Sequence, residues 1–108
     1  MSIRSMAIMK PHAGKRAEML ELLREFYNLM YTKQYSRDIL FFDRNDPELL
    51  VHIRIWLSDE ARAMAVQDPE VHRYWMKLPE LGTMITTYQE LEPIFSTRDG
   101  LDTIGEGM

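Results

Sequence analysis

Three side chains that could take part in chemistry stand at every second position near the end of the segment Leu49–Trp56: His52, Arg54 and Trp56. Alternate residues of an extended strand point to the same face of a sheet, so this spacing predicts that the three share one face. An imidazole can carry a proton, a guanidinium can stabilise an oxyanion or phenolate, and an indole can stack on an aromatic ligand. We therefore predict His52 and Arg54 as catalytic residues and Trp56 as a wall of a substrate pocket.

Each of these residues also has a purely structural interpretation. His52 would then be half-exposed, Arg54 would pair with a carboxylate, and Trp56 would close the core at the end of its strand. The sequence alone does not identify a partner for Arg54, so both interpretations remain open at this point.

Three further aromatic residues are predicted to contact a substrate. If Asn45-Asp46 forms a two-residue turn, Phe41 lies on the same sheet face as His52. Tyr88, in the middle of a predicted strand, supplies a hydroxyl that could orient a substrate. Trp75, on a predicted helix, supplies a second indole.

The sequence does not favour a metal site or a nucleotide cofactor. It has no cysteine, and its three histidines, His12, His52 and His72, are scattered without an HxH or HxxxH pattern. There is also no GxGxxG, P-loop or GxSxG motif. We expect no cofactor, and we keep haem binding through His72 as an alternative.

Hydrophobic patterns define the elements that must position these residues. Apolar residues spaced as on a helix predict one long helix after Gly14. Ser58 is the predicted N-cap of a second helix that is broken at Asp68-Pro69 and ends at Pro79 and Gly82. The predicted strands are Ile3–Met9, Asp38–Asp43, Leu49–Trp56 and Met84–Leu91. The order β-α-β-β-α-β predicts an α+β, ferredoxin-like fold with a four-stranded antiparallel sheet.

Composition limits the class of protein. With 108 residues there is room for one domain, which we place at residues 1–92, followed by a C-terminal tail at residues 93–108. The net charge of −4 and the dispersed basic residues argue against nucleic acid as a partner. The sequence shows neither an apolar run long enough for a membrane span nor a signal peptide, so we expect a cytoplasmic protein with no membrane partner.

Two short motifs resemble a known family. The run Trp56-Leu57-Ser58-Asp59-Glu60-Ala61, followed by Asp68-Pro69, resembles the "W-x-S-x-E-A … S-P" segment of antibiotic biosynthesis monooxygenase (ABM) domains. The segment Lys10-Pro11-His12-Ala13-Gly14-Lys15 is similar to the "K-P-G-K" that begins the first helix in that family. With the element order, the resemblance covers about residues 3 to 92.

The resemblance implies a homodimer in which two sheets meet as a dimeric α/β barrel. It also implies a pocket between sheet and helices for a flat, mostly apolar molecule. Family members include cofactor-independent oxygenases of polyketide aromatics, haem-degrading enzymes and isomerases, so the fold does not choose the activity.

This chain departs from the haem-degrading branch of the family. Ala65 stands where many ABM domains have a histidine, and Ile3–Met9 contains no asparagine. Of that three-residue set only Trp56 is present, so haem degradation by the usual arrangement is not expected. The leading prediction is a cofactor-independent monooxygenase acting on a small aromatic or quinone-like compound. The alternative is a non-catalytic barrel that binds a small molecule or haem.

Overall fold

A computed structural model describes residues 3–97 of the chain. The elements follow the order β-α-β-β-α-α-β, and a single four-stranded sheet has the strand order β2-β3-β1-β4 with every neighbouring pair antiparallel. This confirms the predicted α+β, ferredoxin-like fold. The bounds are β1 Arg4–Pro11, α1 Arg16–Thr32, β2 Ser36–Phe42, β3 Leu50–Trp56, α2 Asp59–Gln67, α3 Pro69–Leu81 and β4 Gly82–Leu91.

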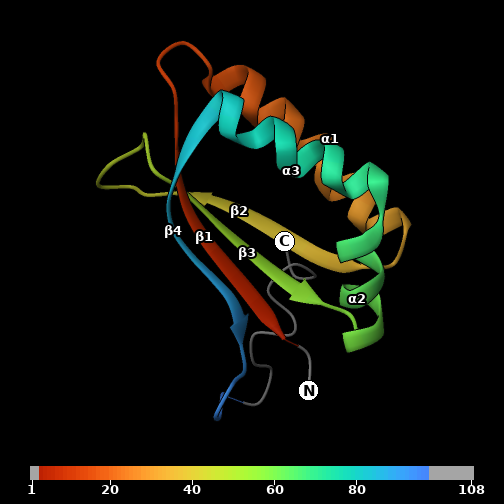
Figure 1. The fold of residues 1–108 in the computed structure, drawn as a ribbon. Helices are drawn as coiled ribbons and strands as arrows, with labels where there is room; N and C mark the ends of the chain where they lie inside the picture. The colour runs from red at the N-terminus through yellow and green to blue at the C-terminus, as the bar shows by residue number, and fades with distance from the viewer. Residues whose placement is uncertain (1–2, 98–108) are drawn as a thin grey trace.

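The molecule has two layers, a sheet and the helices that cover one of its faces (Figure 1). The helices α1 and α3 lie side by side over the sheet, and α2 lies beyond the end of β3. Within residues 3–97 no helix covers the other face of the sheet, which we call the open face. The two sheet faces are therefore different environments for a candidate site: the described helices cover one face and leave the open face uncovered.

The long helix α1 forms because its apolar residues recur on one side. Met19, Leu23, Phe26 and Met30 are each at most 2% exposed, as their spacing predicts. Gly14 precedes the helix with φ of +76°, a backbone conformation that glycine adopts without strain. Burial of this apolar side fixes α1 against the sheet.

The N-terminal caps predicted for the broken second helix are confirmed. The Ser58 hydroxyl accepts a hydrogen bond from the Ala61 backbone N–H at 2.9 Å and begins α2. A carboxylate oxygen of Asp68 accepts from the Glu70 N–H at 2.9 Å, with Pro69 at the first position of α3. These caps explain why α2 and α3 are separate helices.

The prediction for the end of the last helix is confirmed at Gly82, which is the C-cap of α3, and wrong at Pro79. Pro79 lies inside α3, which continues to Leu81, and Gly82 is the first residue of β4. A Cβ on Gly82 would lie 2.8 Å from the Lys10 carbonyl oxygen and 2.9 Å from the Met19 sulfur. Gly82 therefore allows the close approach of β4 to β1 and α1.

The predicted two-residue turn between β2 and β3 is wrong, and this changes which residues share a face. The connection runs over residues 43–49, where Asp43 accepts from the Asn45 N–H at 2.8 Å and the Asp43 N–H donates to the Leu49 carbonyl at 3.0 Å. The resulting register places Phe41 opposite Val51. A shift of one residue moves every side chain of a strand to the other face.

The remaining predictions on chain organisation are only partly covered by the described residues. Residues 92–97 follow β4 without regular structure, whereas residues 98–108 of the predicted tail lie outside the described residues. In the part from residue 3 to 97, no helix has the length and apolarity needed to cross a membrane.

Candidate active site

A cavity of about 490 Å³ lies between the helices and the sheet face that they cover. This volume falls within the range of roughly 300–1,000 Å³ typical of small-molecule sites. Its wall is mostly apolar and includes five of the six predicted site residues: His52, Arg54, Trp56, Trp75 and Tyr88. The structure therefore brings these five together at one cavity.

Phe41 is the exception. It pairs with Val51, whereas His52 pairs with Leu40, so Phe41 lies on the open face and not on the face of the cavity. Its predicted place on the face of His52 is wrong because the actual β2–β3 register differs by one residue from that of a two-residue turn. The side chain is 36% exposed.

Arg54 is held by a carboxylate that sequence reasoning did not identify. Asp38, opposite Arg54 in β2, accepts hydrogen bonds from its Nε at 2.5 Å and its Nη2 at 3.4 Å. Both side chains are almost fully buried, at 4% and 1% exposed. Burial raises the pKa of the Asp38 carboxyl, and the Arg54 guanidinium and the Ser36 hydroxyl oppose this shift.

The guanidinium of Arg54 also contacts two aromatic rings. Its central carbon lies 4.8 Å from the ring centre of Phe26 and 5.3 Å from that of Trp56. Arg54 thus links α1, through Phe26, to the indole at the end of β3. Its structural interpretation, pairing with a carboxylate, is correct, and it also reaches the cavity.

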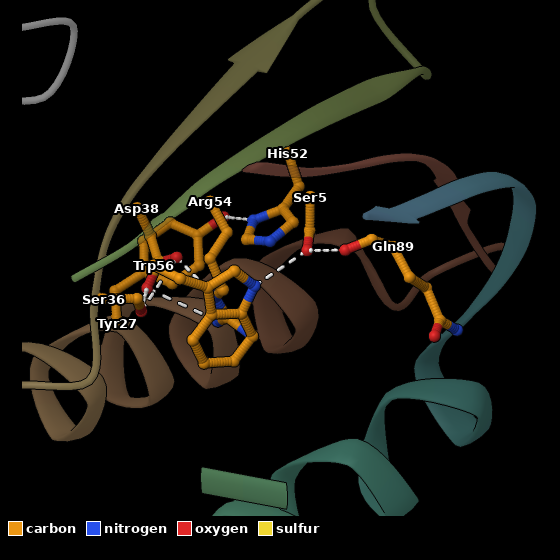
Figure 2. Close-up of polar contacts among 8 residues, drawn as sticks. All are labelled: Ser5, Tyr27, Ser36, Asp38, His52, Arg54, Trp56 and Gln89. Atoms are coloured by element: carbon orange, nitrogen blue, oxygen red, sulfur yellow. Dashed lines mark hydrogen bonds and ion pairs between the residues drawn. The ribbon is translucent and has the colours of Figure 1, made fainter. Parts of the chain in front are cut away.

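Trp56 is fixed by hydrogen bonds across three strands, drawn in Figure 2. Its indole N–H donates to the Ser5 hydroxyl in β1 at 2.9 Å, and that hydroxyl donates to the Gln89 carbonyl oxygen in β4 at 2.8 Å. Trp56 is only 4% exposed, yet it lines the cavity. A buried indole with a satisfied N–H offers a rigid apolar surface to a ligand.

His52 is buried and bonded to the helix layer. Its Nδ1 lies 2.5 Å from the hydroxyl oxygen of Tyr27 in α1. Burial, with a further contribution from the nearby Arg54 charge, lowers the pKa of His52 to about 3. Burial and then the Asp38 carboxylate raise the pKa of Tyr27 far above its usual range, which keeps the phenol protonated.

Sequence reasoning missed Tyr27, Asp38 and Ser5. Tyr27 stands among aromatic residues at helical spacing, which are usually core, and nothing local marks it as a partner of His52. Asp38 carried a usable signal, because a carboxylate at the start of an apolar strand needs a buried cation. Ser5 becomes informative only once the pairing of β1 with β3 and β4 is known.

The described residues do not offer a metal centre. Within residues 3–97 no group of three or more His, Asp or Glu side chains is arranged to hold a metal ion. His72 is not part of the cavity wall, and its Nε2 donates to the backbone carbonyl of Val66. While Nε2 donates to this carbonyl it cannot ligate iron, so only Nδ1 of His72 would be open to a haem iron.

The chain matches no protein-family model and no curated protein. Its structure is similar to a candidate antibiotic biosynthesis monooxygenase from Chloroflexus aurantiacus, with a TM-score of 0.71 and 18% identity over 93% of this chain and 100% of that one. It is also similar to SnoaB, a cofactor-independent oxygenase from Streptomyces nogalater, with a TM-score of 0.70 and 16% identity over 88% and 98% of the two chains. These likenesses show that the chain has an antibiotic biosynthesis monooxygenase-like fold.

Proposed function

We propose that the protein is a cofactor-independent monooxygenase that acts on a small aromatic or quinone-like compound in the cavity. The observation that carries this proposal is the convergence of His52, Arg54 and Trp56 on one mostly apolar cavity. The likeness to SnoaB, a cofactor-independent oxygenase, supports the reaction type.

Such a reaction balances without an added reductant when the substrate itself supplies the electrons. Oxidation of a ring CH₂ to C=O by O₂ releases four electrons, which reduce one oxygen atom to the carbonyl and the other to water. The substrate must first lose a proton to bulk water, before it enters the cavity, and it then binds as an electron-rich anion. The positively charged guanidinium of Arg54 would favour this anion, and the apolar wall of the cavity would exclude water from the reacting carbon.

The placement of the aromatic residues suits a flat ligand. Trp56 provides a fixed wall, and we propose Trp75 and Tyr88 as further substrate contacts at the same cavity. We do not carry Phe41 forward as a contact within one subunit, because it lies on the open face.

The proposal can be tested with a hydroxylated anthrone as the probe substrate. Protein treated with a chelator should consume O₂ and form the quinone in equal amounts, faster than heat-denatured protein. We expect Trp56→Phe to lower kcat/KM by about tenfold or more, because the ring that positions the substrate changes shape and the bond to Ser5 is lost. Tyr31→Phe, at a 61% exposed residue outside the cavity wall, should leave it unchanged. A rate equal to that of denatured protein would contradict the proposal.

A non-catalytic binding protein is the second candidate, and one observation favours it. The charge of Arg54 is already matched by Asp38, and the pKa of His52, lowered to about 3, makes its imidazole a weak base, so neither is an obvious proton acceptor. Against it, the pKa of His52 is lowered to about 3 and the pKa values of Tyr27 and Asp38 are raised, and perturbed pKa values cluster at functional sites. Saturable binding of the anthrone without turnover would support this second candidate.

We also propose that the protein is a homodimer joined through the open face. Apolar side chains of three adjacent strands lie there, each only partly buried: Ile8, Ile39, Val51 and Ile53. A contiguous apolar sheet face of this kind is typical of an interface. The likeness to the ABM fold supports the same arrangement.

A further inference from the structure

The hydrogen bond between Tyr27 and His52 has only one consistent direction. A tyrosine hydroxyl has one hydrogen, and a buried hydroxyl needs an acceptor for it. Within residues 3–97, the only hydrogen-bond partner of the Tyr27 hydroxyl is Nδ1 of His52, at 2.5 Å. The phenol therefore donates and Nδ1 accepts, so Nδ1 carries no proton.

The second nitrogen of His52 must then carry the ring proton. A neutral imidazole holds one hydrogen, and with Nδ1 as acceptor it sits on Nε2. Nε2 makes no hydrogen bond with the residues described, and His52 is part of the cavity wall. In Figure 2 the imidazole lies with Tyr27 on one side and the Ser5–Trp56 hydrogen bond on the other.

Several polar groups near His52 are already engaged in hydrogen bonds with one another. The Trp56 indole N–H donates to Ser5, and the Ser5 hydroxyl donates to the Gln89 carbonyl. Asp38 accepts from two nitrogens of Arg54. The Nε2–H group of His52, a residue of the cavity wall, is thus a donor with no protein acceptor among the described residues.

We infer that Tyr27 is a positioning residue that locks His52 in its neutral, Nε2-protonated form, so that His52 donates a hydrogen bond to an oxygen of the ligand. This rests on the proposed function and narrows it. The substrate class becomes aromatic compounds that present a phenolate, enolate or quinone oxygen to Nε2. His52 stabilises the anion and does not remove the substrate proton.

The charges around His52 agree with this role. Arg54 lies on the same strand, Asp38 on β2, and Tyr27 on α1, while Arg62 of α2 lines the cavity and pairs with Glu90 of β4 at 2.9 Å. A donor in a mostly apolar cavity with a guanidinium nearby favours an anionic oxygen over a neutral one.

The tautomer can be observed directly in the full-length protein labelled with ¹⁵N-histidine. Two-dimensional ¹H–¹⁵N NMR should show His52 with a protonated Nε2 and an unprotonated Nδ1, and this pattern should stay constant from pH 8 to pH 5. Replacing His12 and His72 in turn assigns the three imidazoles. In Tyr27→Phe the His52 signals should shift to a mixture of the two tautomers.

Tyr31→Phe is the matched control, since it removes an exposed hydroxyl from the same helix. It should leave the His52 signals unchanged. An Nδ1-protonated His52, or a pure Nε2-protonated form that survives in Tyr27→Phe, would overturn the inference. Both results are independent of whether the protein turns over any substrate.

The donor role is tested with 4-nitrophenol, whose absorbance reports its protonation state. The wild-type protein should bind the phenolate in preference to the phenol. His52→Leu should weaken phenolate binding by about tenfold to a hundredfold, as expected for the loss of one hydrogen bond to a charged group. His52→Gln, which keeps an N–H donor, should retain most of the binding. Equal binding by all three proteins would overturn the donor role. Phenolate binding that depends on His52, together with no oxygenation of an anthrone, would refute the proposed function alone.

Discussion

At the scale of single residues, the buried pair of Arg54 and Asp38 is the feature on which the site most depends. Each side chain is at most 4% exposed, so each needs the other to offset the loss of water. The pair also positions the guanidinium between Phe26 and Trp56. Its loss should therefore affect both stability and the shape of the cavity.

We expect Asp38→Asn to lower the free energy of unfolding by about 3 kcal/mol or more, because it leaves the Arg54 charge buried without a counter-charge. Urea denaturation at fixed protein concentration measures this change. Glu21→Gln is the control, since Glu21 and Arg24 form an exposed pair at 3.7 Å whose loss should cost less than about 1 kcal/mol. Equal effects of the two substitutions would contradict the importance of the buried pair.

The depressed pKa of His52 predicts a pH dependence of stability. The folded protein holds His52 neutral down to a pKa of about 3, whereas the unfolded chain protonates it near its usual value of 6.5. The unfolded state thus binds more protons below that value, and stability is lost as pH falls from 6.5 towards 3. By pH 5 the loss due to His52 should approach about 1.4 kcal/mol per pH unit.

Urea denaturation of the wild type and of His52→Gln between pH 7 and about pH 5 isolates this contribution. The free energy of unfolding should change less steeply with pH in the variant than in the wild type. The difference in slope should correspond to the uptake of nearly one proton on unfolding. Parallel curves would mean that His52 is not held neutral in the folded state.

At the scale of elements, local and non-local signals contributed very differently to what the sequence could predict. The Ser58 and Asp68 caps and the apolar side of α1 involve residues within a turn or two of each other, and these predictions are confirmed. The β2–β3 register depends on the geometry of residues 43–49, which composition does not specify. That single error placed Phe41 on the face of His52 and hid Asp38 as the partner of Arg54.

The contact between His52 and Tyr27 shows the same limit. The strand alternation correctly predicted that His52, Arg54 and Trp56 share a face, and all three line the cavity. Which face the helices cover, and which helix side chain meets His52, depends on packing between elements that lie 25 residues apart in the chain. The residues of the site were thus largely predictable, but their hydrogen-bond partners were not.

The close approach at the start of β4 predicts a sensitive glycine. Gly82→Ala should lower the free energy of unfolding by about 1–3 kcal/mol, because its Cβ would meet the Lys10 backbone oxygen, which cannot move independently of β1. Thr83→Ala, at the exposed neighbouring position, is the control and should change stability by less than about 0.5 kcal/mol. Chemical denaturation of both variants distinguishes steric conflict from a general weakness of the strand.

At the scale of the whole molecule, the open face predicts how the protein assembles. Light scattering at micromolar concentration should give a mass near twice the 12.8 kDa of one chain. Ile53→Glu, in the middle of the open face, should shift the mass towards the monomer because it would bury a charge in the interface. Met76→Glu, at a residue that is 75% exposed on α3, should remain dimeric. A wild-type mass near that of one chain would contradict the dimer.

The chain contains only two tryptophans, Trp56 and Trp75, and both line the cavity. All of its indole emission therefore originates at the wall of one chamber. The tryptophan fluorescence of the unmodified protein should therefore report ligand binding without any attached dye. A flat coloured compound that enters the cavity should quench this fluorescence in proportion to the fraction of protein molecules that have bound it.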